Sequence, residues 1–329
     1  MKAINVALLG LGTVGKGVYQ TINTHQERLR DITGCSVHVS TFLIEHPEKH
    51  ATVNGTTVTD IRTITENPDI DIVFEAIVGK EPAFSYLKKC IQAGKHVITA
   101  NKEMFAVHGK ELRELARQHH VSIGYDATTA GGIPIIQMIQ HVLQANNVLK
   151  VQAILNGTTN YILTEMRDQN AAFEDALQQA QQLGYAEADP TNDVEGFDAF
   201  YKLMILSELI YNEQPNWNDV KRIGITSISE KDIAENQLTN KRIKHIASIW
   251  KEDGRILAKV EPVSLPRDHP LYAIEGVDNA INIETDILGE LTLKGPGAGA
   301  LPTASAMIED FCLIYSGKSQ KEKSTVVVS

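Results

Sequence analysis

The residues best suited to chemistry are concentrated between Gly184 and Lys202. This stretch carries five carboxylates and then ends on a lysine: Glu187, Asp189, Asp193, Glu195 and Asp198, followed by Lys202. A lysine that is flanked by carboxylates and partly removed from water has a tunable pKa, which acid–base chemistry requires. Carboxylates can also bind the polar groups of a small substrate. The stretch therefore predicts a site where an amine exchanges a proton with an oxygen.

The same stretch changes from turns to a helix along its length. Pro190 and Gly196 interrupt its first part, and from Phe197 onward the apolar residues recur at helical spacing. Asp198 and Lys202 then lie four residues apart on one helix face. The alternative is an acidic surface loop before an ordinary helix, with an exposed ion pair worth about 0.3 kcal/mol. A lysine and several acids do not name a reaction, so the rest of the chain must supply the other reactant.

Length and composition narrow the classes of protein. A chain of 329 residues favours two domains, and contents of 43% hydrophobic and 22% charged residues are those of a globular protein. The net charge of −10 argues against binding nucleic acid or an anionic membrane surface. No apolar run approaches the roughly 20 residues of a membrane span. Cys35, Cys90 and Cys312 lack metal-ligand spacing, which fits reduced thiols in the cytoplasm.

A glycine motif follows an apolar strand at the start of the chain. The motif is Gly10-Leu11-Gly12-Thr13-Val14-Gly15, and a helix is expected from about Val14 to Leu29. The first glycine permits a tight turn, the second lets a pyrophosphate approach the backbone, and the third lets helix and strand pack closely. The helix N-terminus offers free N–H groups to phosphates. The alternative is a glycine-rich turn with a structural role only.

Strands and helices alternate after this motif, which predicts a doubly wound parallel sheet. The expected strands are Ser36–Ile44, Asp71–Ile77, His96–Ala100 and Val121–Tyr125, and the expected helices are Pro82–Ala93 and Gly109–His120. The strand that contains Thr99 ends on Asn101 and Lys102, at a carboxyl edge where open α/β sheets bind ligands. Thr99 and Lys102 are therefore candidate contacts of a cofactor, and Lys102 is the second lysine of interest.

The composition changes between about residues 130 and 150, where the main domain boundary is expected. A small-residue loop, Asp126–Pro134, leads to a helix over Ile135–Ala145, and a strand over Val151–Leu155 runs into a polar turn at Asn156–Asn160. That turn can hold a substrate or cap the next helix, and both readings stay open. Later segments favour strands of an antiparallel or mixed sheet, at Arg255–Val263, Asn279–Thr285 and Leu288–Leu293. The glycine loop Gly295–Gly299 then precedes a final helix that ends near Tyr315.

Six motifs, in order from residue 3 to about 315, resemble the homoserine dehydrogenase family. They are Gly10–Gly15, Ala93–Lys102, Ala130–Pro134, Leu155–Tyr161, Gly184–Lys202, and Gly295–Gly299 with the Pro-Thr-Ala-Ser that follows. The resemblance implies a Rossmann-type domain at residues 1–135 that is rejoined by the helix at about 303–317. It also implies an α+β substrate-binding and dimerisation domain with a mixed sheet at 136–302, and a tail at 318–329. The reaction implied is the NAD(P)-dependent interconversion of L-homoserine and L-aspartate 4-semialdehyde, a step in threonine, methionine and isoleucine biosynthesis.

The resemblance also assigns roles to individual residues. Lys202 resembles the proton donor and acceptor, and Lys102 the lysine beside cofactor and substrate. Glu187 and Asp198 resemble substrate ligands, with Asp193, Asn156 and Thr158 as further candidates around them. Thr13 and Val14 resemble cofactor contacts in the glycine turn, as do Gly184 and Gly299 at more distant points. Hydride attack on an aldehyde builds negative charge on oxygen, which an ammonium within hydrogen-bond reach stabilises and protonates.

Two positions depart from the family. Its members usually have Glu where Asp126 stands, in a loop that resembles a monovalent-cation site. The ligands there would be the Asp126 carboxylate and the carbonyls of Thr129, Gly131 and Ile133, so a sodium ion is implied, although Asp is one methylene shorter. The other departure is Glu45, where relatives often have arginine. A carboxylate beyond the second strand can accept hydrogen bonds from ribose hydroxyls and repels a 2′-phosphate, which favours NAD over NADP.

Two other interpretations compete with homoserine dehydrogenase. One is another Rossmann oxidoreductase acting on an amino-acid semialdehyde or an amine, and the other is a nucleotide-sensing regulator that kept the fold. The regulator predicts loss of one of the lysines or carboxylates, and all are present. The resemblance further implies a homodimer. The sequence is also read as a short form without a C-terminal regulatory module, and hence without sensitivity to threonine through such a module.

Overall fold

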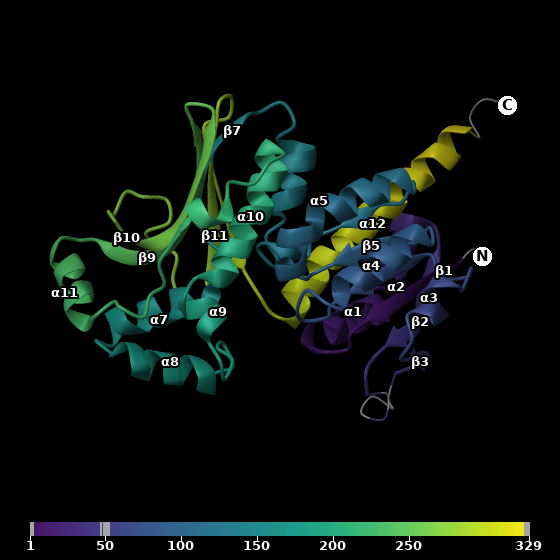
Figure 1. Cartoon of the computed structure of the whole chain (residues 1–329), viewed down its shortest axis with the longest axis horizontal. Coiled ribbons are helices and arrows are strands. Elements are labelled where there is room, and N and C mark those ends of the chain that lie inside the picture. The colour runs from purple at the N-terminus through teal and green to yellow at the C-terminus, as the bar shows by residue number, and fades with distance from the viewer. Residues whose placement is uncertain (1–2, 47, 49–52, 326–329) are drawn as a thin grey trace. The chain divides into compact units, whose positions relative to one another are not determined.

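The computed structural model describes residues 3–46, 48 and 53–325, with side chains up to residue 316. The chain divides into two compact units (Figure 1). Unit 1 comprises residues 1–128 and 299–329, and unit 2 comprises residues 129–298. Each unit has its own six-stranded sheet.

Unit 1 is built on sheet A, in which every strand pairing is parallel. Its strand order is β3-β2-β1-β4-β5-β6. The strands are β1 Ala3–Leu9, β2 Ser36–Leu43, β3 Thr56–Val58, β4 Ile72–Glu75, β5 His96–Thr99 and β6 Ile123–Gly124. The helices are α1 Thr13–Thr24, α2 Gln26–Thr33, α3 Arg62–Thr65, α4 Ala83–Gln92, α5 Lys102–Gln118, η2 Asp126–Thr128 and α12 Ala300–Thr325. The prediction of a doubly wound parallel sheet is confirmed.

The last helix, α12, completes the core of unit 1 although it follows unit 2 in the chain (Figure 1). Its buried side chains, among them Met307 and Phe311, share one apolar cluster with Val6, Leu8 and Val18. Gly17 of α1 allows the two helices to approach closely, since an added Cβ would lie 2.5 Å from the Ala300 carbonyl oxygen. Burial of these apolar side chains is the main favourable term that holds the sheet and helices together.

Unit 2 is built on sheet B, whose strand order is β12-β11-β7-β9-β10-β8. The strands are β7 Val148–Ile154, β8 Lys221–Arg222, β9 Arg242–Glu252, β10 Arg255–Leu265, β11 Asp278–Thr285 and β12 Glu290–Pro296. All pairings are antiparallel except that of β10 with β8, so the predicted mixed sheet is confirmed.

The helices of unit 2 include a long buried one, α10, which packs against α9 and the strands β9 and β10. The helices are α6 Ile135–Gln137, η3 Met138–Val142, α7 Gly157–Asp168, α8 Phe173–Gln182, α9 Thr191–Val194, α10 Phe197–Tyr211, η4 Trp217–Asp219 and α11 Glu230–Leu238. From Asp198 to Glu208, only Tyr201 of α10 is not buried. A helix that is buried nearly all round offers little flexibility to the side chains it carries. The polar groups on α10 are therefore held in fixed positions.

Several elements differ from the sequence expectation. The helix expected from Val14 to Leu29 is two helices that meet at His25, and the helix expected over Gly109–His120 starts earlier, at Lys102. Strands β3 and β9 were not predicted. β9 could not be predicted from an apolar pattern, because the polar residues Lys244, His245 and Ser248 interrupt its apolar residues. In the structure all three are buried.

Two helical ends also differ. The helix expected over Ile135–Ala145 is a short α-helix followed by the π-helix η3, which ends at Val142. The last helix, α12, continues to Thr325, across residues that the sequence assigned to a tail. The expected helix end near Tyr315 was therefore wrong. Residues 326–329 lie outside the described part of the chain.

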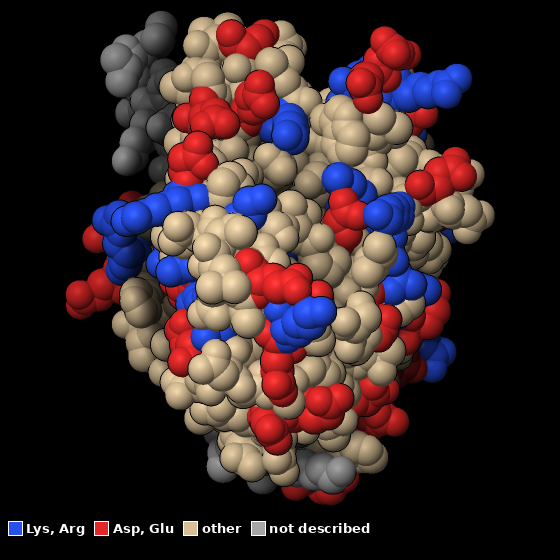
Figure 2. Space-filling model, turned by 90° about the vertical axis from the view of Figure 1, so that its left-hand side faces the viewer, with Lys and Arg blue, Asp and Glu red and all other residues tan. Residues whose placement is uncertain are grey.

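Charged side chains of both signs are interspersed over the face shown in Figure 2. The excess of acidic residues behind the net charge of −10 is thus not gathered into one single-sign area on that face. Among the described residues, no helix is long and apolar enough to cross a membrane.

Candidate active site

Lys202 and Asp198 form a buried ion pair on α10. The Lys202 Nζ donates to Asp198 Oδ2 at 2.7 Å and to the carbonyl oxygen of Leu155, at the end of β7, at 2.6 Å. Asp198 is 3% exposed and Lys202 is 7% exposed. The surface-pair alternative is therefore wrong. A buried charge requires partners because the loss of its hydration costs roughly several kcal/mol. Here the Lys202 ammonium and the Asp198 carboxylate compensate each other.

Asn156 joins this pair to a second carboxylate. As the N-cap of α7, its Oδ1 accepts from Thr159 N at 2.8 Å. Its Nδ2 donates to Asp193 Oδ1 at 2.7 Å and to Asp198 Oδ2 at 2.8 Å. Asn156 thus caps the helix and also belongs to the polar cluster, so the two readings of the Asn156–Asn160 turn are compatible. The cluster consists of Asn156, Asp193, Asp198 and Lys202.

A tightly packed turn places Asp198 at the start of α10. Gly196 has φ +81°, and an added Cβ would lie 3.1 Å from Cε1 of His245 on β9. The His245 Nε2–H donates to the Ile223 carbonyl at 3.0 Å, and burial lowers the pKa of this histidine. Arg222 donates to the Glu195 carbonyl at 2.5 Å and stacks on the Phe197 ring at 3.4 Å from the ring centroid. The glycine and these contacts fix the direction of the Asp198 side chain.

The remaining substrate candidates lie on two neighbouring segments. Thr158 Oγ1 donates to the Tyr185 carbonyl at 2.7 Å, which ties α7 to the stretch after α8. Gly184, which is a cofactor candidate, has φ +76° and is exposed, as is the Glu187 side chain. Within the described part of the chain, no hydrogen bond or ion pair joins the Glu187 carboxylate to the cluster. The structure thus assembles Asn156, Asp193, Asp198 and Lys202, and leaves Glu187 apart from them.

The glycine turn of unit 1 has the geometry that a dinucleotide requires. Gly10 has φ +87°, and an added Cβ at Gly15 would lie 2.2 Å from the Gly10 carbonyl oxygen. At Gly12, by contrast, an added Cβ would meet no heavy atom of the described chain within 4 Å. Gly12 is the N-cap of α1 and offers no side chain to the first helical N–H groups. This open helix N-terminus, exposed at Gly12 and Thr13, suits a pyrophosphate.

A second polar cluster lies at the carboxyl ends of β4 and β5. Thr99 and Asn101 are buried, and Asn101 caps α5, whose first residue is Lys102. Glu75, the last residue of β4, is 0% exposed and receives a hydrogen bond from Thr99 Oγ1 at 2.5 Å. Burial raises the pKa of Glu75 to about 7. Neither Glu75 nor Asn101 was a predicted site residue, although a carboxylate inside the run Ile72-Val73-Phe74-Glu75-Ala76-Ile77 is a usable signal.

The remaining cofactor candidates of unit 1 lie at separate points. Glu45 is exposed and stands two residues beyond β2, where the Leu43 carbonyl accepts from Gly10 N at 3.0 Å. Leu11 is 5% exposed and belongs to the core. Val14 is half-buried against that core. Gly299 has φ +116° and accepts a bond from Thr303 N at the start of α12.

The candidate cation ligands fall on both sides of the division between the units. In unit 1, Asp126 is fully buried, and its backbone N–H donates to Asp310 Oδ2 at 2.9 Å. In unit 2, Thr129 and Ile133 are buried and Gly131 has φ +57°. A carboxylate and backbone carbonyls are hard oxygen donors, which suit a hard cation. No group of three or more His, Cys, Asp or Glu among the described residues has a geometry that could hold a metal.

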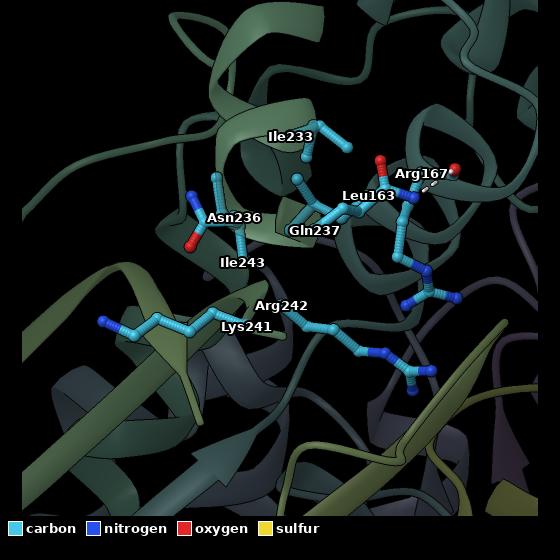
Figure 3. Close-up of a pocket in the computed structure, with 8 residues that line it drawn as sticks. All are labelled: Leu163, Arg167, Ile233, Asn236, Gln237, Lys241, Arg242 and Ile243. Carbon is cyan, nitrogen blue, oxygen red and sulfur yellow. Dashed lines mark hydrogen bonds between the residues drawn. The ribbon is translucent and has the colours of Figure 1, made fainter. Parts of the chain in front are cut away.

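Unit 2 also has a small hollow between α7, α11 and β9 (Figure 3). Arg167, Lys241 and Arg242 contribute to its lining. The guanidinium groups of Arg167 and Arg242 both donate to Glu275, at 2.7 and 2.5 Å. These arginines are therefore already paired with a carboxylate. None of the predicted site residues lines this hollow.

A glycine turn on a doubly wound sheet, together with a buried lysine–carboxylate cluster in a second unit, is typical of a nicotinamide-dependent oxidoreductase. Comparison with known proteins gives the particular family. The NAD-binding domain of homoserine dehydrogenase matches residues 10–126, and the homoserine dehydrogenase domain matches residues 134–312. The chain belongs to the homoserine dehydrogenase family.

Individual relatives agree with this assignment. The chain is 39% identical to the homoserine dehydrogenase of Bacillus subtilis over 317 residues, which is 95% of this chain and 73% of that protein. It is 34% identical to the NAD(+)-dependent homoserine dehydrogenase of Pseudomonas canavaninivorans in an alignment 353 positions long, which covers 99% of this chain and 100% of that protein. The crystal structure of a homoserine dehydrogenase from Thiobacillus denitrificans superposes with a TM-score of 0.93 at 36% identity, covering 97% of this chain and 75% of that one.

The enzyme therefore interconverts L-homoserine and L-aspartate 4-semialdehyde with NAD(P), a reaction of amino-acid biosynthesis. The resemblance found in the sequence is confirmed. The other readings, a different semialdehyde or amine oxidoreductase and a nucleotide-sensing regulator, are not favoured by the family match.

Proposed function

We propose that Lys202 is the proton donor and acceptor of this reaction and that Asp198, Asp193 and Asn156 bind the substrate around it. The observation that carries the proposal is the buried chain of hydrogen bonds from Leu155 O through Lys202 Nζ and Asp198 Oδ2 to Asn156. Buried charges held in one geometry are costly for stability and are found where function requires them. Glu187 and Thr158 remain further substrate candidates.

The geometry supports a specific division of work. When homoserine is oxidised, its hydroxyl proton must leave, and an amine at Lys202 can accept it; in the reverse direction the ammonium returns a proton to the aldehyde oxygen. The carboxylates of Asp193 and Asp198 can hold the substrate's ammonium group and so fix its orientation. When bound, NAD(P) accepts or supplies the hydride. The glycine turn would hold its pyrophosphate, and Lys102 and Thr99 would lie at the carboxyl edge of the sheet beside its reactive end.

The decisive experiment replaces Lys202 by a cation that cannot give up its proton. Arginine stays protonated throughout the working pH range. Lys202→Arg and Lys202→Ala should therefore both lower kcat by about 100-fold or more, the scale for a general acid–base group. Lys221→Ala is the matched control, because Lys221 is an exposed lysine of the same unit, paired with Glu261 at 2.7 Å. Near-normal kcat in Lys202→Arg would move the role to Lys102 or to water.

We also propose that NAD is preferred over NADP. Glu45 is exposed next to the β2 end that contacts the glycine turn. No arginine occurs between Arg30 and Arg62, and His46 is paired with Glu48 at 3.3 Å. A ribose 2′-phosphate would therefore meet carboxylates. The NAD(+)-dependent relative from Pseudomonas canavaninivorans supports this preference. Lys49, a possible counter-charge, lies outside the described residues.

Three further features belong to the proposal. A sodium ion would bind the Asp126 carboxylate and the carbonyls of Thr129, Gly131 and Ile133. Replacing sodium by choline in the buffer should then lower the unfolding temperature of the wild type more than that of Asp126→Ala.

We also propose a homodimer, which the mass from light scattering would test. A location in the cytoplasm agrees with the free thiols of Cys35, Cys90 and Cys312.

A further inference from the structure

Glu75 occupies the point of sheet A where the strand order reverses. β4 lies between β1 and β5, and Glu75 is in register with Leu9 on one side and with Thr99 on the other. Leu9 immediately precedes Gly10 of the glycine turn. In open α/β sheets the ligand binds in the crevice outside this reversal point. A buried carboxylate therefore stands at the base of the predicted cofactor site.

Both oxygens of Glu75 accept hydrogen bonds from uncharged donors. Oε1 accepts from Ile77 N at 2.6 Å, and Oε2 accepts from Thr99 Oγ1 at 2.5 Å. Thr99 Oγ1 itself accepts from Asn101 N at 3.0 Å. Because a hydroxyl has one proton, Thr99 can accept from Asn101 and still donate to Glu75. This arrangement suits an ionised carboxylate.

Asn101 closes the hydrogen bonds into a ring. Its Nδ2 donates to the carbonyls of Ile77 and Gly79 at 2.9 and 2.7 Å. Its Oδ1 accepts from Met104 N at 3.0 Å and so caps α5. The ring, made of Glu75, Ile77, Thr99 and Asn101, joins the loop after β4 to the N-terminus of α5. Lys102 is the first residue of that helix, so the ring sets the position of its backbone.

Among the residues that the structure describes, none supplies a cation that pairs with Glu75. Burial raises its pKa to about 7, and the opposing influences are the hydrogen bonds from Thr99 and Ile77 and the nearby Asn101 amide, all of them uncharged. The charged neighbours Lys80 and Glu103, on the adjoining loop and on α5, are paired with each other at 3.5 Å. A buried glutamate is ordinarily paired with a cation. Its retention here without one indicates a role beyond packing.

We propose that Glu75 is a positioning residue, whose carboxylate holds the 76–79 loop and the Asn101 cap so that Lys102 faces the reactive end of the cofactor. The inference rests on the proposed role of Lys102. Protonation of Glu75 would place a hydrogen on Oε2, the oxygen that faces Thr99, and Glu75 would then donate to the Thr99 hydroxyl instead of accepting from it. The ring would lose its arrangement, so catalysis should weaken as pH falls through about 7.

The test follows kcat/KM for homoserine from about pH 6 to about pH 9 in the wild type, Glu75→Gln and Thr99→Val. The wild type should show an inflection near pH 7. Glu75→Gln should lose this inflection and be about tenfold slower at pH 8, the scale of a small displacement in a reacting site. Thr99→Val should move the inflection to higher pH, because the Thr99 hydrogen bond lowers the pKa of Glu75. The control is Glu111→Gln, because Glu111 is an exposed carboxylate on α5 that is paired with Lys88 of α4. This variant should behave as the wild type.

Three outcomes would overturn the proposal: no wild-type inflection, an unchanged inflection in Glu75→Gln, or an unmoved inflection in Thr99→Val. Binding of NADH, followed by its fluorescence over the same pH range, gives a second readout that needs no turnover. If Lys102→Ala retains normal kcat while the Glu75 inflection is present, the assigned role of Lys102 fails, and Glu75 then acts on catalysis through the 76–79 loop and not through Lys102. If Glu75→Gln does not fold, Thr99→Val and the NADH titration decide the matter.

Discussion

Two buried carboxylates, Asp198 in unit 2 and Glu75 in unit 1, solve the same physical problem differently. Asp198 is 3% exposed and has an ammonium 2.7 Å away; Glu75 is 0% exposed and has only N–H and O–H dipoles. A cation offsets most of the cost of removing a carboxylate from water, whereas dipoles offset less of it. The type of partner, more than burial, therefore decides how a buried acid responds to pH and to mutation.

Removing one member of the buried pair should have the largest effect on stability. Asp198→Leu leaves the Lys202 ammonium buried with the Leu155 carbonyl and should lower the unfolding free energy by about 3–5 kcal/mol. The double variant Asp198→Leu/Lys202→Met removes both charges and should lose less than the single variant. Urea unfolding measures both. A double variant less stable than Asp198→Leu would show that the ammonium does not offset the Asp198 charge.

At Glu75 we expect the unfolding free energy to depend on pH. Its folded-state pKa is raised from 4.5 to about 7, so the native state holds this proton more tightly than the unfolded state. The stability that this gives below pH 4.5 is lost as pH rises towards 7. Between about pH 4 and pH 8 the wild type should lose about 3 kcal/mol more than Glu75→Gln. Parallel curves of unfolding free energy against pH for the two proteins would contradict this.

An exposed carboxylate, Glu45, provides the third case, in which the charge acts on a ligand instead of on stability. The wild type should prefer NAD over NADP in kcat/KM by at least about tenfold, about 1.4 kcal/mol. Glu45→Arg should shrink or reverse that preference, with unfolding unchanged. Equal or better use of NADP by the wild type would contradict the assignment of Glu45 and leave the reaction intact.

The smallest effect is expected at a surface pair. Lys88 and Glu111 lie 2.8 Å apart with side chains 40% and 50% exposed. Solvent screening should limit the contribution of this pair to about 0.5 kcal/mol or less. Thermal unfolding of Lys88→Ala tests it, and a loss comparable with that of Asp198→Leu would mean that distance alone, without burial, sets the strength of such pairs in this protein.

The parallel sheet and the glycine turn could be predicted because their signals are local. Short apolar strands alternate with helices, and Gly10, Gly12 and Gly15 each meet a distinct steric demand. Asp198 and Lys202 were likewise within reach, since a spacing of four on a helix places both on one face. What their spacing could not give is burial, which depends on strands and helices distant in the sequence.

The features that were missed depend on long-range contacts. His245 reaches the Gly196 turn only because β9 lies beside it, and β9 itself is interrupted by polar residues that pair in the folded unit, such as Lys244 with Glu275 at 3.2 Å. Glu75 was missed because it lies in an apolar strand. Its ring with Thr99 and Asn101 depends on the parallel register of β4 and β5, which the sequence does not show. Glu187 shows the reverse case, because its type and position suggest a ligand, yet the structure leaves it exposed and apart from the cluster.

The contribution of α12 to the core of unit 1 has a consequence for synthesis on the ribosome. Unit 1 consists of two segments of the chain separated by residues 129–298. The side chains of α12 that fill its core, such as Met307 and Phe311, emerge after all of unit 2. Domains made of one continuous segment generally fold as they are synthesised. Unit 2 should therefore become compact first, while the core between sheet A, α1 and α2 stays incomplete until α12 has been synthesised.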